Sequence, residues 1–551
     1  MNSRRLVFLL AITLSAFLLV VACGSNEVEN LSREKEGAAT SLPIESVVSP
    51  AKTAEFPTAA PIGSEPSIPA PLIAVSPTEP PLPIAIAALS PGDPLSDEDV
   101  ATLLVELASS DTSEADDALE SILEAKDIRF ISVLIELMRG RELGIARGTY
   151  SKIIDGLQEL SDQQFGQNWP AWVEWYGKSD LQPPPGFTGW KGLLLGRIDP
   201  GFSDFLRDDH PSRIRVEEIQ WGGVPIDGIP PLESAPTLPG LEADYLEDDE
   251  PVFGVIVNGD SRAYPLRIID NHEMANDVIG GVPVSLAYCT LCGAAIAYDG
   301  RSPDGQVFDF GTSGFLYRSN KLMYDRQTRT LWNQLTGEPV LGELANQEIN
   351  LDILPVVLTS WSDWLDQHPD TLVLDRATGY YSPETYVPGI FYGDYFSSSE
   401  TMFPVWQRSG LLPPKEFVYA LHLNGAPKAY QVEALANDKV LNDTLGGQPV
   451  VLIANRGTVT VDGLHQAQGP VFYDAGGEVR AFDRGDDTFI AGDDADSVID
   501  NTGNQWLVNE EALIGPDGKL AERLPGHLAY WFGWYAFFPN TQLYSTSSAS
   551  E

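Results

Sequence analysis

The chain has 551 residues, of which 43% are hydrophobic and 10% aromatic, so it is long and apolar enough to form two or three folded domains. Asp and Glu outnumber Lys and Arg by 79 to 34, which gives a formal net charge of −45. Because this charge repels phosphate backbones, we expect no nucleic-acid partner. Only three cysteines are present, which excludes a fold held together by many disulfides.

Residues 1–22 are predicted to be a signal peptide. Two arginines precede an apolar run at residues 6–22, which is shorter than the roughly 20 residues that a spanning helix needs. The run leads into Cys23 and resembles the lipobox of bacterial lipoproteins, which implies cleavage before Cys23 and lipidation of that residue. We therefore expect a lipid-anchored protein on the extracytoplasmic side of the cell membrane, with an uncleaved signal anchor as the alternative.

Residues 23–94 are predicted to be a disordered, Pro-rich linker. Proline alternates there with Ala, Ser, Thr and Glu, and no apolar periodicity is present. Such sequences favour extended conformations and act as semi-rigid spacers. We expect the linker to hold the folded part away from the membrane; binding to a proline-recognising module is the alternative.

The stretch 95–180 is predicted to be a small helical module. Ser96 has the features of a helix N-cap, because three acidic residues follow it and apolar residues then recur at helical spacing. Similar stripes predict helices at 115–123, 131–138 and 153–157. Helices of this length joined by short turns resemble HEAT-type stacked hairpins. We expect this module to serve as a spacer or to bind a protein partner.

From residue 186 onward the sequence predicts a mainly β domain, because short alternating apolar runs are separated by Gly, Asn, Asp and Pro. Five dipeptides of this region recur 166 residues later without a gap. The five pairs are Asn258-Gly259 and Asn424-Gly425, Ala263-Tyr264 and Ala429-Tyr430, Asn276-Asp277 and Asn442-Asp443, Gly280-Gly281 and Gly446-Gly447, and Pro283-Val284 and Pro449-Val450. We infer two copies of one β-rich unit, at 186–400 and 401–545. The expected fold class is α+β multidomain: a small all-α HEAT-like module followed by a mainly β domain built from these two copies.

The repeated positions are expected to be structural. An Asn-Gly dipeptide between alternating apolar residues predicts a tight hairpin turn. A weaker match continues downstream, where Tyr324-Asp325-Arg326 corresponds to Phe482-Asp483-Arg484 and Trp332 to Trp506.

The candidate site is a cysteine pair that is present in the first copy and absent from the second. The first copy alone has Cys289 and Cys292, two residues apart and followed by glycine between two apolar strands. A tight turn there would direct both sulfurs at one point, which is half of a zinc or copper site with His272 as the expected third ligand. Alternatively the pair forms a structural or redox-active disulfide, as an exported protein readily does, or remains as buried free thiols.

Three further residues are candidates to hydrogen-bond to the ligands of this site and hold them in place: Glu273, Asp325 and Arg326. The last two are also expected to form an ion pair, because a guanidinium group matches a carboxylate. A thioredoxin-like arrangement is disfavoured, since the residues after Cys292 predict a strand where that arrangement needs a helix.

Residues 271–293 and 311–334 closely resemble the DUF3179 family, with further similarity at 361–371 and 375–380. The resemblance spans about residues 186–544. The usual Cys-Pro-Leu-Cys motif of the family is Cys-Thr-Leu-Cys here. The resemblance names the domain and implies no established activity.

These observations favour a membrane-anchored extracytoplasmic lipoprotein with a soft-metal site, for zinc or copper, at Cys289, Cys292 and His272. The first alternative is a thiol-disulfide or other redox enzyme acting through the same cysteines. The second is a structural or interaction protein in which the cysteines form a staple. Whether the chain is an enzyme stays open at this point.

Overall fold

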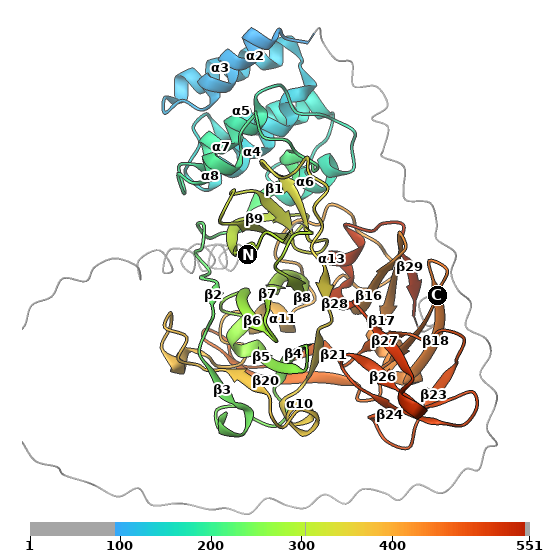
Figure 1. Cartoon of the computed structure of the whole chain (residues 1–551). Helices are drawn as coiled ribbons and strands as arrows, with labels where there is room; N and C mark the ends of the chain where they lie inside the picture. Colours follow the sequence, from blue (N-terminus) through green and yellow to red (C-terminus); the bar gives the residue numbers. More distant parts are fainter. Residues whose placement is uncertain (1–93, 304, 546–551) are drawn as a thin grey trace, which may run out of the picture. The chain divides into compact units, whose positions relative to one another are not determined.

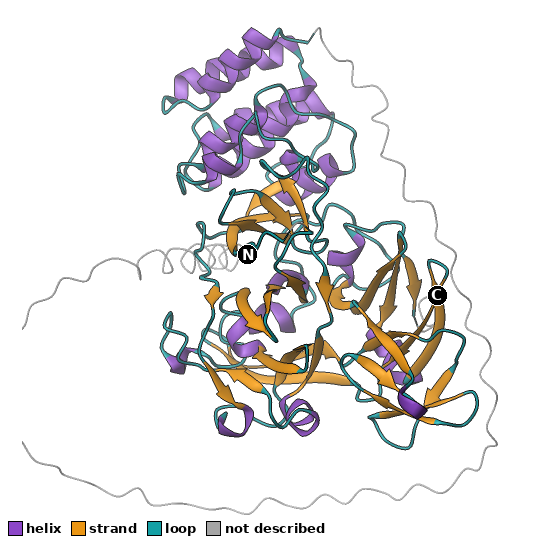
Figure 2. Cartoon of the chain, viewed as in Figure 1, coloured by secondary structure: helices purple, strands orange, loops and turns teal. Residues whose placement is uncertain are grey.

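The computed structural model describes residues 94–303 and 305–545. The expected signal peptide, the lipidated Cys23 and nearly all of the Pro-rich linker lie outside these residues. Within them, no helix is both long and apolar enough to cross a membrane. Helices make up the N-terminal part and strands most of the remainder, so the chain is of the α+β class (Figures 1 and 2).

The helical part forms as the apolar spacing predicts. Its helices are α2 (Asp97–Leu107), α3 (Thr112–Ala125), α4 (Ile131–Glu142), α5 (Tyr150–Ser161), α6 (Trp169–Gly177), α7 (Phe187–Leu195) and α8 (Phe202–Phe205). Ser96 is the N-cap of α2, because its side chain accepts a hydrogen bond from the Asp99 backbone N–H. The helix α3 ends where Lys126 takes a left-handed conformation. The expected N-cap and the four expected helices are confirmed.

The helical part extends further than expected. The expected β domain begins at residue 186, but α7 follows there and its Phe187, Trp190 and Leu194 are buried in the same core as α2–α6. These three residues recur at helical spacing, so the pattern was present in the sequence. The buried Trp406 of the β part also belongs to this core.

The β part is divided here into a first half (residues 219–400) and a second half (residues 401–545). The strands of the first half are β1 (Ile219–Trp221), β2 (Leu232–Glu233), β3 (Thr237–Pro239), β4 (Pro251–Val257), β5 (Asp260–Pro265), β6 (Met274–Ile279), β7 (Val282–Cys289), β8 (Ala294–Asp299), β9 (Phe310–Tyr317), β10 (Asn320–Asp325), β11 (Leu331–Asn333), β12 (Glu338–Leu341), β13 (Ile353–Leu354), β14 (Val357–Ser360) and β15 (Leu372–Leu374). Its short helices are α9 (Leu266–Ile269), α10 (Trp361–Gln367) and α11 (Gly393–Ser397).

The second half continues with the same kind of elements. Its strands are β16 (Phe417–Leu423), β17 (Ala426–Gln431), β18 (Val440–Leu445), β19 (Gln448–Ile453), β20 (Thr458–His465), β21 (Gly469–Gly477), β22 (Arg480–Asp483), β23 (Phe489–Ala491), β24 (Ser497–Asp500), β25 (Gln505–Val508), β26 (Ala512–Ile514), β27 (Leu520–Leu524), β28 (His527–Tyr530) and β29 (Gln542–Tyr544). Its helices are α12 (Val432–Asp438) and α13 (Trp531–Tyr535). The largest hydrophobic core contains side chains from both halves.

The two halves have sheets with the same strand order. In the first half β14, β4, β5 and β15 are neighbours, with the last pair parallel and the others antiparallel. In the second half β28, β16, β17 and β29 are arranged in the same order and directions. The turns between the paired strands also match, because Asn258-Gly259 and Asn424-Gly425 all have positive φ. The predicted hairpin turns are therefore confirmed.

Side-chain hydrogen bonds recur at the repeated positions. The Asp277 carboxylate accepts from Arg262 at 2.6 Å and from the Tyr264 hydroxyl at 2.8 Å. In the second half the Asp443 carboxylate accepts from Lys428 at 2.6 Å and from Tyr430 at 2.7 Å. In each half, the carboxylate ties the second strand of one hairpin to the first strand of the next.

The downstream match differs from the one expected from sequence. The Trp332 indole N–H donates to Asp325 at 2.8 Å, and the Trp506 indole N–H donates to Asp500 at 2.9 Å. The two tryptophans therefore occupy similar environments, but the counterpart of Asp325 is Asp500 and not Asp483.

Asp483 corresponds to a different residue of the first half. It pairs with Val450 at the end of β22, as Asp299 pairs with Val284 at the end of β8. The match of Tyr324-Asp325-Arg326 with Phe482-Asp483-Arg484 is therefore wrong. The constant offset of 166 residues ends where the connection between β19 and β22 becomes longer than that between β7 and β8.

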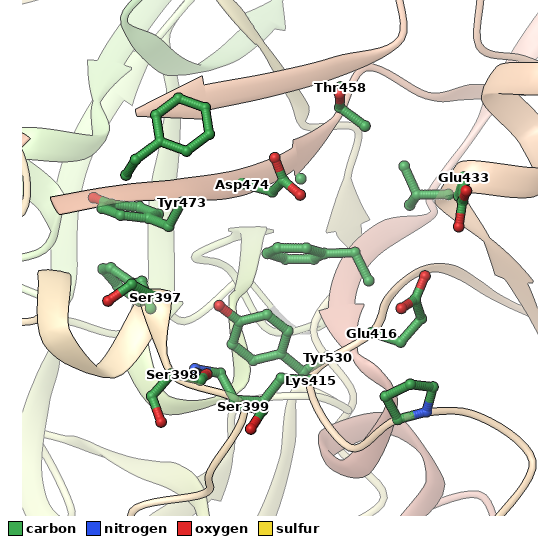
Figure 3. A pocket seen from close by; sticks show the side chains of 16 residues that line it. Ser397, Ser398, Ser399, Lys415, Glu416, Glu433, Thr458, Tyr473, Asp474 and Tyr530 are labelled. Carbon is green, nitrogen blue, oxygen red and sulfur yellow. Dashed lines mark hydrogen bonds between the residues drawn. The ribbon is translucent and has the colours of Figure 1, made fainter. Parts of the chain in front are cut away.

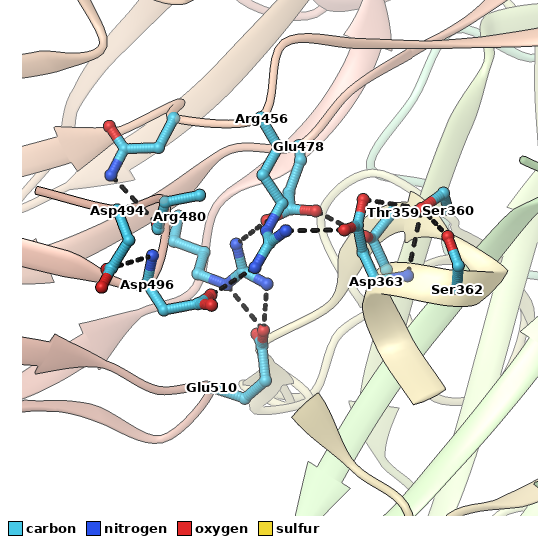
Figure 4. Close-up of polar contacts among 12 residues, drawn as sticks. Thr359, Ser360, Ser362, Asp363, Arg456, Glu478, Arg480, Asp494, Asp496 and Glu510 are labelled. Carbon is cyan, nitrogen blue, oxygen red and sulfur yellow. Dashed lines mark hydrogen bonds and ion pairs between the residues drawn. The ribbon is translucent and has the colours of Figure 1, made fainter. Parts of the chain in front are cut away.

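A buried cluster of charges joins the two halves (Figure 4). Arg480 is buried and pairs with Glu478 and with Glu510, which its Nε reaches at 2.6 Å. Arg456 of the second half pairs with Asp363 of α10 in the first half at 2.6 Å. Such a cluster is costly to break, because removing one member leaves an uncompensated buried charge.

Candidate functional site

The two cysteines occupy one tight turn of the first half. Cys289 is the last residue of β7, residues Thr290–Cys292 form a single 3-10 turn, and Gly293 leads into β8 with a φ of 58°. Glycine suits this left-handed conformation, which reverses the chain within a few residues. Both cysteines are free thiols, with exposed fractions of 1% for Cys289 and 0% for Cys292. The predicted turn is present, and the expected strand after it is β8.

The two thiols are not equivalent. Burial raises the pKa of Cys289, but hydrogen bonds from the Cys292 thiol and from the backbone N–H groups of Lys321 and Cys292 outweigh it, so the pKa lies below its ordinary value. Burial and the hydrogen bond to Cys289 raise the pKa of Cys292 well above its ordinary value. The Cys292 Sγ also lies 3.4 Å from the Ser319 carbonyl oxygen. Of the two thiols, Cys289 therefore loses its proton more readily, and Cys292 keeps its proton and donates to it.

Glu273, one of the candidate supporting residues, lies beside the cysteine turn. Its carboxylate accepts a hydrogen bond from Thr290, the residue after Cys289, at 3.0 Å. The Lys321 Nζ donates to the Glu273 carbonyl oxygen at 2.8 Å and lies 3.6 Å from the carboxylate. Burial lowers the pKa of Lys321. Glu273, Lys321 and Leu291 line a cavity of about 70 Å³, so two charged groups face one side of the cysteine turn.

His272 is held away from metal coordination. Its Nδ1 lies 2.7 Å from the Pro230 carbonyl oxygen and its Nε2 lies 2.6 Å from the Tyr386 hydroxyl. Since a carbonyl only accepts, Nδ1 carries the proton and Nε2 accepts from Tyr386. Burial lowers the pKa of His272 to about 4, so the ring is neutral. Both ring nitrogens are therefore already used.

The expected three-ligand metal site is not formed by these side chains. Within residues 94–303 and 305–545, no group of three or more His, Cys, Asp or Glu residues is arranged to hold a metal ion. This holds for Cys289, Cys292 and His272 as well. The sequence placed His272 close to the cysteines along the chain, but its ring is directed to Pro230 and Tyr386.

Asp325 and Arg326 have other roles than expected. Asp325 is buried and accepts from Trp332 and from the Thr328 backbone N–H at 2.6 Å, which stabilises a turn. Arg326 pairs with Asp227 at 2.8 Å. Among the residues that the structure describes, no ion pair joins Asp325 to Arg326, so the expected pair is replaced by these contacts.

The second half covers the cysteine turn. A Cβ atom placed on Gly533 of α13 would lie 3.1 Å from the Cys292 Sγ, so a larger residue there would push against the thiol. A Cβ on Gly293 would lie 2.9 Å from the Phe417 ring and 3.3 Å from the Tyr530 ring. These contacts, which link residues far apart in the chain, carry no sequence signal.

A larger pocket of about 650 Å³ lies next to these rings (Figure 3). Phe417 and Tyr530 line it, so the rings that pack on Gly293 also form a wall of the pocket. Tyr395 connects the two sites, because its hydroxyl donates to the Leu291 carbonyl oxygen at 2.6 Å while the Lys415 Nζ lies 3.8 Å from its ring centroid. Neither Tyr395 nor Lys415 is predicted from the sequence, because neither belongs to any of the motifs described above.

Comparison with known proteins agrees with the sequence resemblance. No curated protein and no solved structure matches the chain. A family model described as "Protein of unknown function (DUF3179)" matches residues 226–541, which starts later than the expected residue 186. The matched part includes the cysteine turn, Lys321, Lys415 and the pocket residues. The chain therefore belongs to the DUF3179 family.

Proposed function

We propose that this chain is an extracytoplasmic lipoprotein, anchored through Cys23, whose Cys289 and Cys292 are reversibly oxidised to a disulfide. The observation that carries the proposal is the pair of free, buried, adjacent thiols whose pKa values are shifted in opposite directions. An attacking thiolate next to a protonated thiol is the arrangement that thiol-disulfide exchange needs. The signal peptide and lipobox expected from the sequence would place the protein in an oxidising compartment, where such chemistry operates.

The reaction is a balanced exchange with a disulfide of another molecule. The Cys289 thiolate attacks one sulfur of that disulfide, which forms a mixed disulfide and releases the first thiolate. Cys292 then loses its proton to the released thiolate and attacks the Cys289 Sγ. The Cys289–Cys292 disulfide closes, the second thiolate leaves, and the partner has gained the two electrons that the cysteines have lost.

Burial limits which molecules can take part. Cys292 lies under Gly533 and the turn lies under Phe417 and Tyr530, so a folded protein cannot reach the sulfurs directly. The cavity beside Glu273, Lys321 and Leu291 adjoins the turn, because Leu291 is part of both. We expect small disulfides to react, or larger ones only after these rings move.

We also propose that the two halves of the β part derive from one duplicated unit and that the helices stack as in HEAT repeats. The shared strand order and the recurring hydrogen bonds of Asp277 and Asp443 support the duplication. The successive helix pairs α2–α3 and α4–α5 support the HEAT-like arrangement. The helical module is the surface that we assign to a protein partner.

The central experiment titrates the thiol pair. The full-length protein is equilibrated in dithiothreitol buffers of increasing oxidised fraction, alkylated and cleaved with trypsin, which releases both cysteines in one peptide, residues 268–301. We expect one transition from two alkylated thiols to one disulfide, at a potential above about −300 mV. A pair that stays alkylated throughout, or a bridge that resists reduction below that potential, would overturn the redox proposal.

Single variants separate the roles of the two cysteines. Cys292→Ser should trap a mixed disulfide at Cys289 with a small disulfide such as oxidised glutathione, and Cys289→Ser should trap much less, because the pKa of Cys292 is raised. Ser285→Ala, on β7 but outside the turn, is the matched control.

Metal analysis of the same samples tests the alternative that the two cysteines bind zinc or copper. One zinc or copper ion per chain that both cysteine variants lose would replace the redox proposal with a metal site.

The anchor is tested separately. Cys23→Ser should move the protein from the membrane fraction to the soluble extracytoplasmic fraction without changing the redox transition of residues 268–301. Retention of this variant in the membrane would support the uncleaved signal anchor in place of the lipid.

A further inference from the structure

The pocket of about 650 Å³ has a size typical of sites for small ligands. It lies where α11, the β20–β21 hairpin and the end of β28 meet, and its lining does not include the cysteines. In Figure 3, Lys415 and Tyr530 are close to one another, and Asp474 and Glu433 lie on the opposite wall.

Lys415 is a cation without a counter-ion at this pocket. Within the described residues no carboxylate lies within 4.0 Å of its Nζ, which instead donates to the carbonyl oxygens of Tyr395 and of Ser398, the latter at 2.8 Å. Burial lowers the pKa of Lys415 to about 8. The two carbonyls accept two of the three ammonium hydrogens, and the Tyr395 ring lies 3.8 Å from the Nζ, so a ligand would accept the third hydrogen beside this ring. The carbonyl contacts also stabilise the C-terminal end of α11.

Two tyrosine hydroxyls at the pocket have no hydrogen-bond partner among the residues that the structure describes. They belong to Tyr473 and Tyr530, whose side chains line the pocket with exposed fractions of 5% and 2%. Neither hydroxyl oxygen is fully buried, so both are open to the pocket and can bond to water or to a ligand there. Both rings, together with Phe417, give the pocket an aromatic wall.

The opposite wall carries the complementary charge. Asp474 and Glu433 line it, and within the described part of the chain neither carboxylate forms an ion pair. The third carboxylate of the lining, Glu416, accepts a hydrogen bond from Gln431 at 2.9 Å. Phe472, at the same wall, is 66% exposed, which is unusual for a phenylalanine and leaves its ring free to cover a bound molecule.

We propose that this pocket binds a short peptide through its two free termini, the C-terminal carboxylate at Lys415 and the N-terminal ammonium at Asp474 and Glu433. The hydroxyls of Tyr473 and Tyr530 bond to the peptide backbone, and the aromatic wall packs against an apolar side chain. The site lies beyond the thiol pair and does not depend on the redox reaction.

The charges of the pocket and of the chain favour this class over two others. A phosphorylated or otherwise strongly anionic ligand would be repelled by the net charge of −45 and by the two unpaired carboxylates. A neutral oligosaccharide would use the hydroxyls and rings but would leave Lys415 without a counter-ion. Both classes become outcomes of the test.

The test compares four forms of one tripeptide, Ala-Tyr-Ala, by isothermal titration calorimetry on the unmodified full-length protein. The forms have both termini free, the C-terminus amidated, the N-terminus acetylated, or both blocked. We expect saturable binding of the free peptide and a loss of at least about tenfold in affinity on blocking either terminus. Equal binding of all four forms, or no saturable binding of the free peptide, would overturn the proposal.

Variants assign each terminus to its wall. In Lys415→Met the free and amidated peptides should bind equally weakly, and in the double variant Glu433→Gln with Asp474→Asn the free and acetylated peptides should do so. Lys519→Met and Glu522→Gln, which lie outside the pocket lining, are the matched controls and should bind like the unmodified protein. Lys415→Met with an unchanged circular dichroism spectrum can be compared directly with the unmodified protein. If this variant still binds the free peptide more tightly than the amidated one, the assignment of the C-terminal carboxylate to Lys415 is contradicted. Because the four-peptide comparison needs no variant, it decides the proposal even if Lys415→Met does not fold.

Discussion

The connection between β7 and β8 in the first half and the one between β19 and β22 in the second half join equivalent strands in very different ways. The first is the cysteine turn of residues 290–293, and the second runs over residues 454–479 and contains the β20–β21 hairpin. The strands around both connections keep the same pairing. The framework is thus shared, and each half has a different structure at the same point of it.

Each half completes the site of the other. The hairpin of the second half packs on α11 of the first half, where a Cβ on Gly393 would lie 2.7 Å from Val471, and it supplies one wall of the pocket. In return α13 of the second half covers Cys292. Equivalent frameworks should therefore respond alike to substitution, and the diverged positions should not.

The largest effects are expected at the two tryptophans of the framework. Trp332 and Trp506 are 0% and 2% exposed and meet Phe310 and Phe489 edge-on at 5.3 Å and 5.2 Å. Trp332→Ala and Trp506→Ala should each lower the free energy of unfolding by about 3–5 kcal/mol, because a large buried side chain is lost. Urea denaturation measures both, with the half-buried Trp169→Ala as control. A cost below about 1 kcal/mol for only one of the pair would show that the two positions are not equivalent.

Two buried histidines are expected to make stability depend on pH. Burial lowers the pKa of His272 and of His527 to about 4, below the value of about 6.5 in the unfolded chain. Both rings are neutral in the fold, so the stability they contribute is complete above pH 6.5 and is lost as the pH falls toward 4. The loss amounts to as much as about 3 kcal/mol for each histidine. Urea denaturation between pH 7 and pH 4 measures it.

The two buried histidines differ in whether an apolar residue can replace them. His527 pairs with Ala420 in β28, and the corresponding position in β14 is Val357, which pairs with Gly254. Neither ring nitrogen of His527 has a hydrogen-bond partner among the described residues. His527→Leu should therefore be tolerated at pH 7 and should flatten the pH dependence, whereas His272→Leu should cost about 1–3 kcal/mol at pH 7, because the Pro230 carbonyl loses its donor. An unchanged pH profile in His527→Leu would contradict the assignment.

A smaller effect is expected at the repeated asparagines. Asn276 bonds to the Phe310 backbone and Asn442 to the Phe489 backbone, each through both its amide nitrogen and its oxygen. The Asn276 oxygen also accepts from Ser285 at 2.8 Å. Asn276→Ala and Asn442→Ala should each cost about 1–3 kcal/mol, with the larger cost in the first half. Denaturant midpoints of the two variants give the order, and the reverse order would contradict it.

The local features of the fold were predictable from the sequence, and the long-range ones were not. The Asn-Gly turns and the helix beginning after Ser96 depend on residues adjacent in the chain. The partners of His272 lie 42 and 114 residues away, so no local pattern shows that its ring nitrogens are occupied. The close approach of Gly533 to Cys292 was not predictable either, because the two residues belong to different halves of the chain.

The candidate site was predicted in part. The cysteine turn between two strands and the nearby Glu273 follow from short-range pattern. Lys321 and Lys415 were not predicted, because a single lysine in a strand or loop belongs to no motif. Lys321 is distinguished only by its burial beside the Cys289 thiol, and Lys415 only by its burial without a carboxylate partner. The wrong match of Asp325 with Asp483 has a physical cause as well. The hairpin inserted between β19 and β22 changes the offset between the halves, and an alignment without gaps cannot follow it.

The smallest effect is expected where the second half exposes a sheet face that the first half buries. Leu507 of β25 pairs with Ile514 of β26, which pairs with Leu520 of β27, and these side chains are 51%, 38% and 60% exposed. In the first half, every residue of β11 is buried. If this row of three side chains were part of a core, replacing one of them would lower the free energy of unfolding as much as replacing a buried leucine does.

Because the row is exposed, Leu507→Thr should change the free energy of unfolding by less than about 0.5 kcal/mol. Leu331→Thr in β11, which is fully buried, is the matched comparison and should cost several times more. Urea denaturation of the two variants gives the ratio. A large loss in the free energy of unfolding for Leu507→Thr would mean that this face is covered in solution. The two halves would then differ in what covers their surfaces as well as in the connections between their strands.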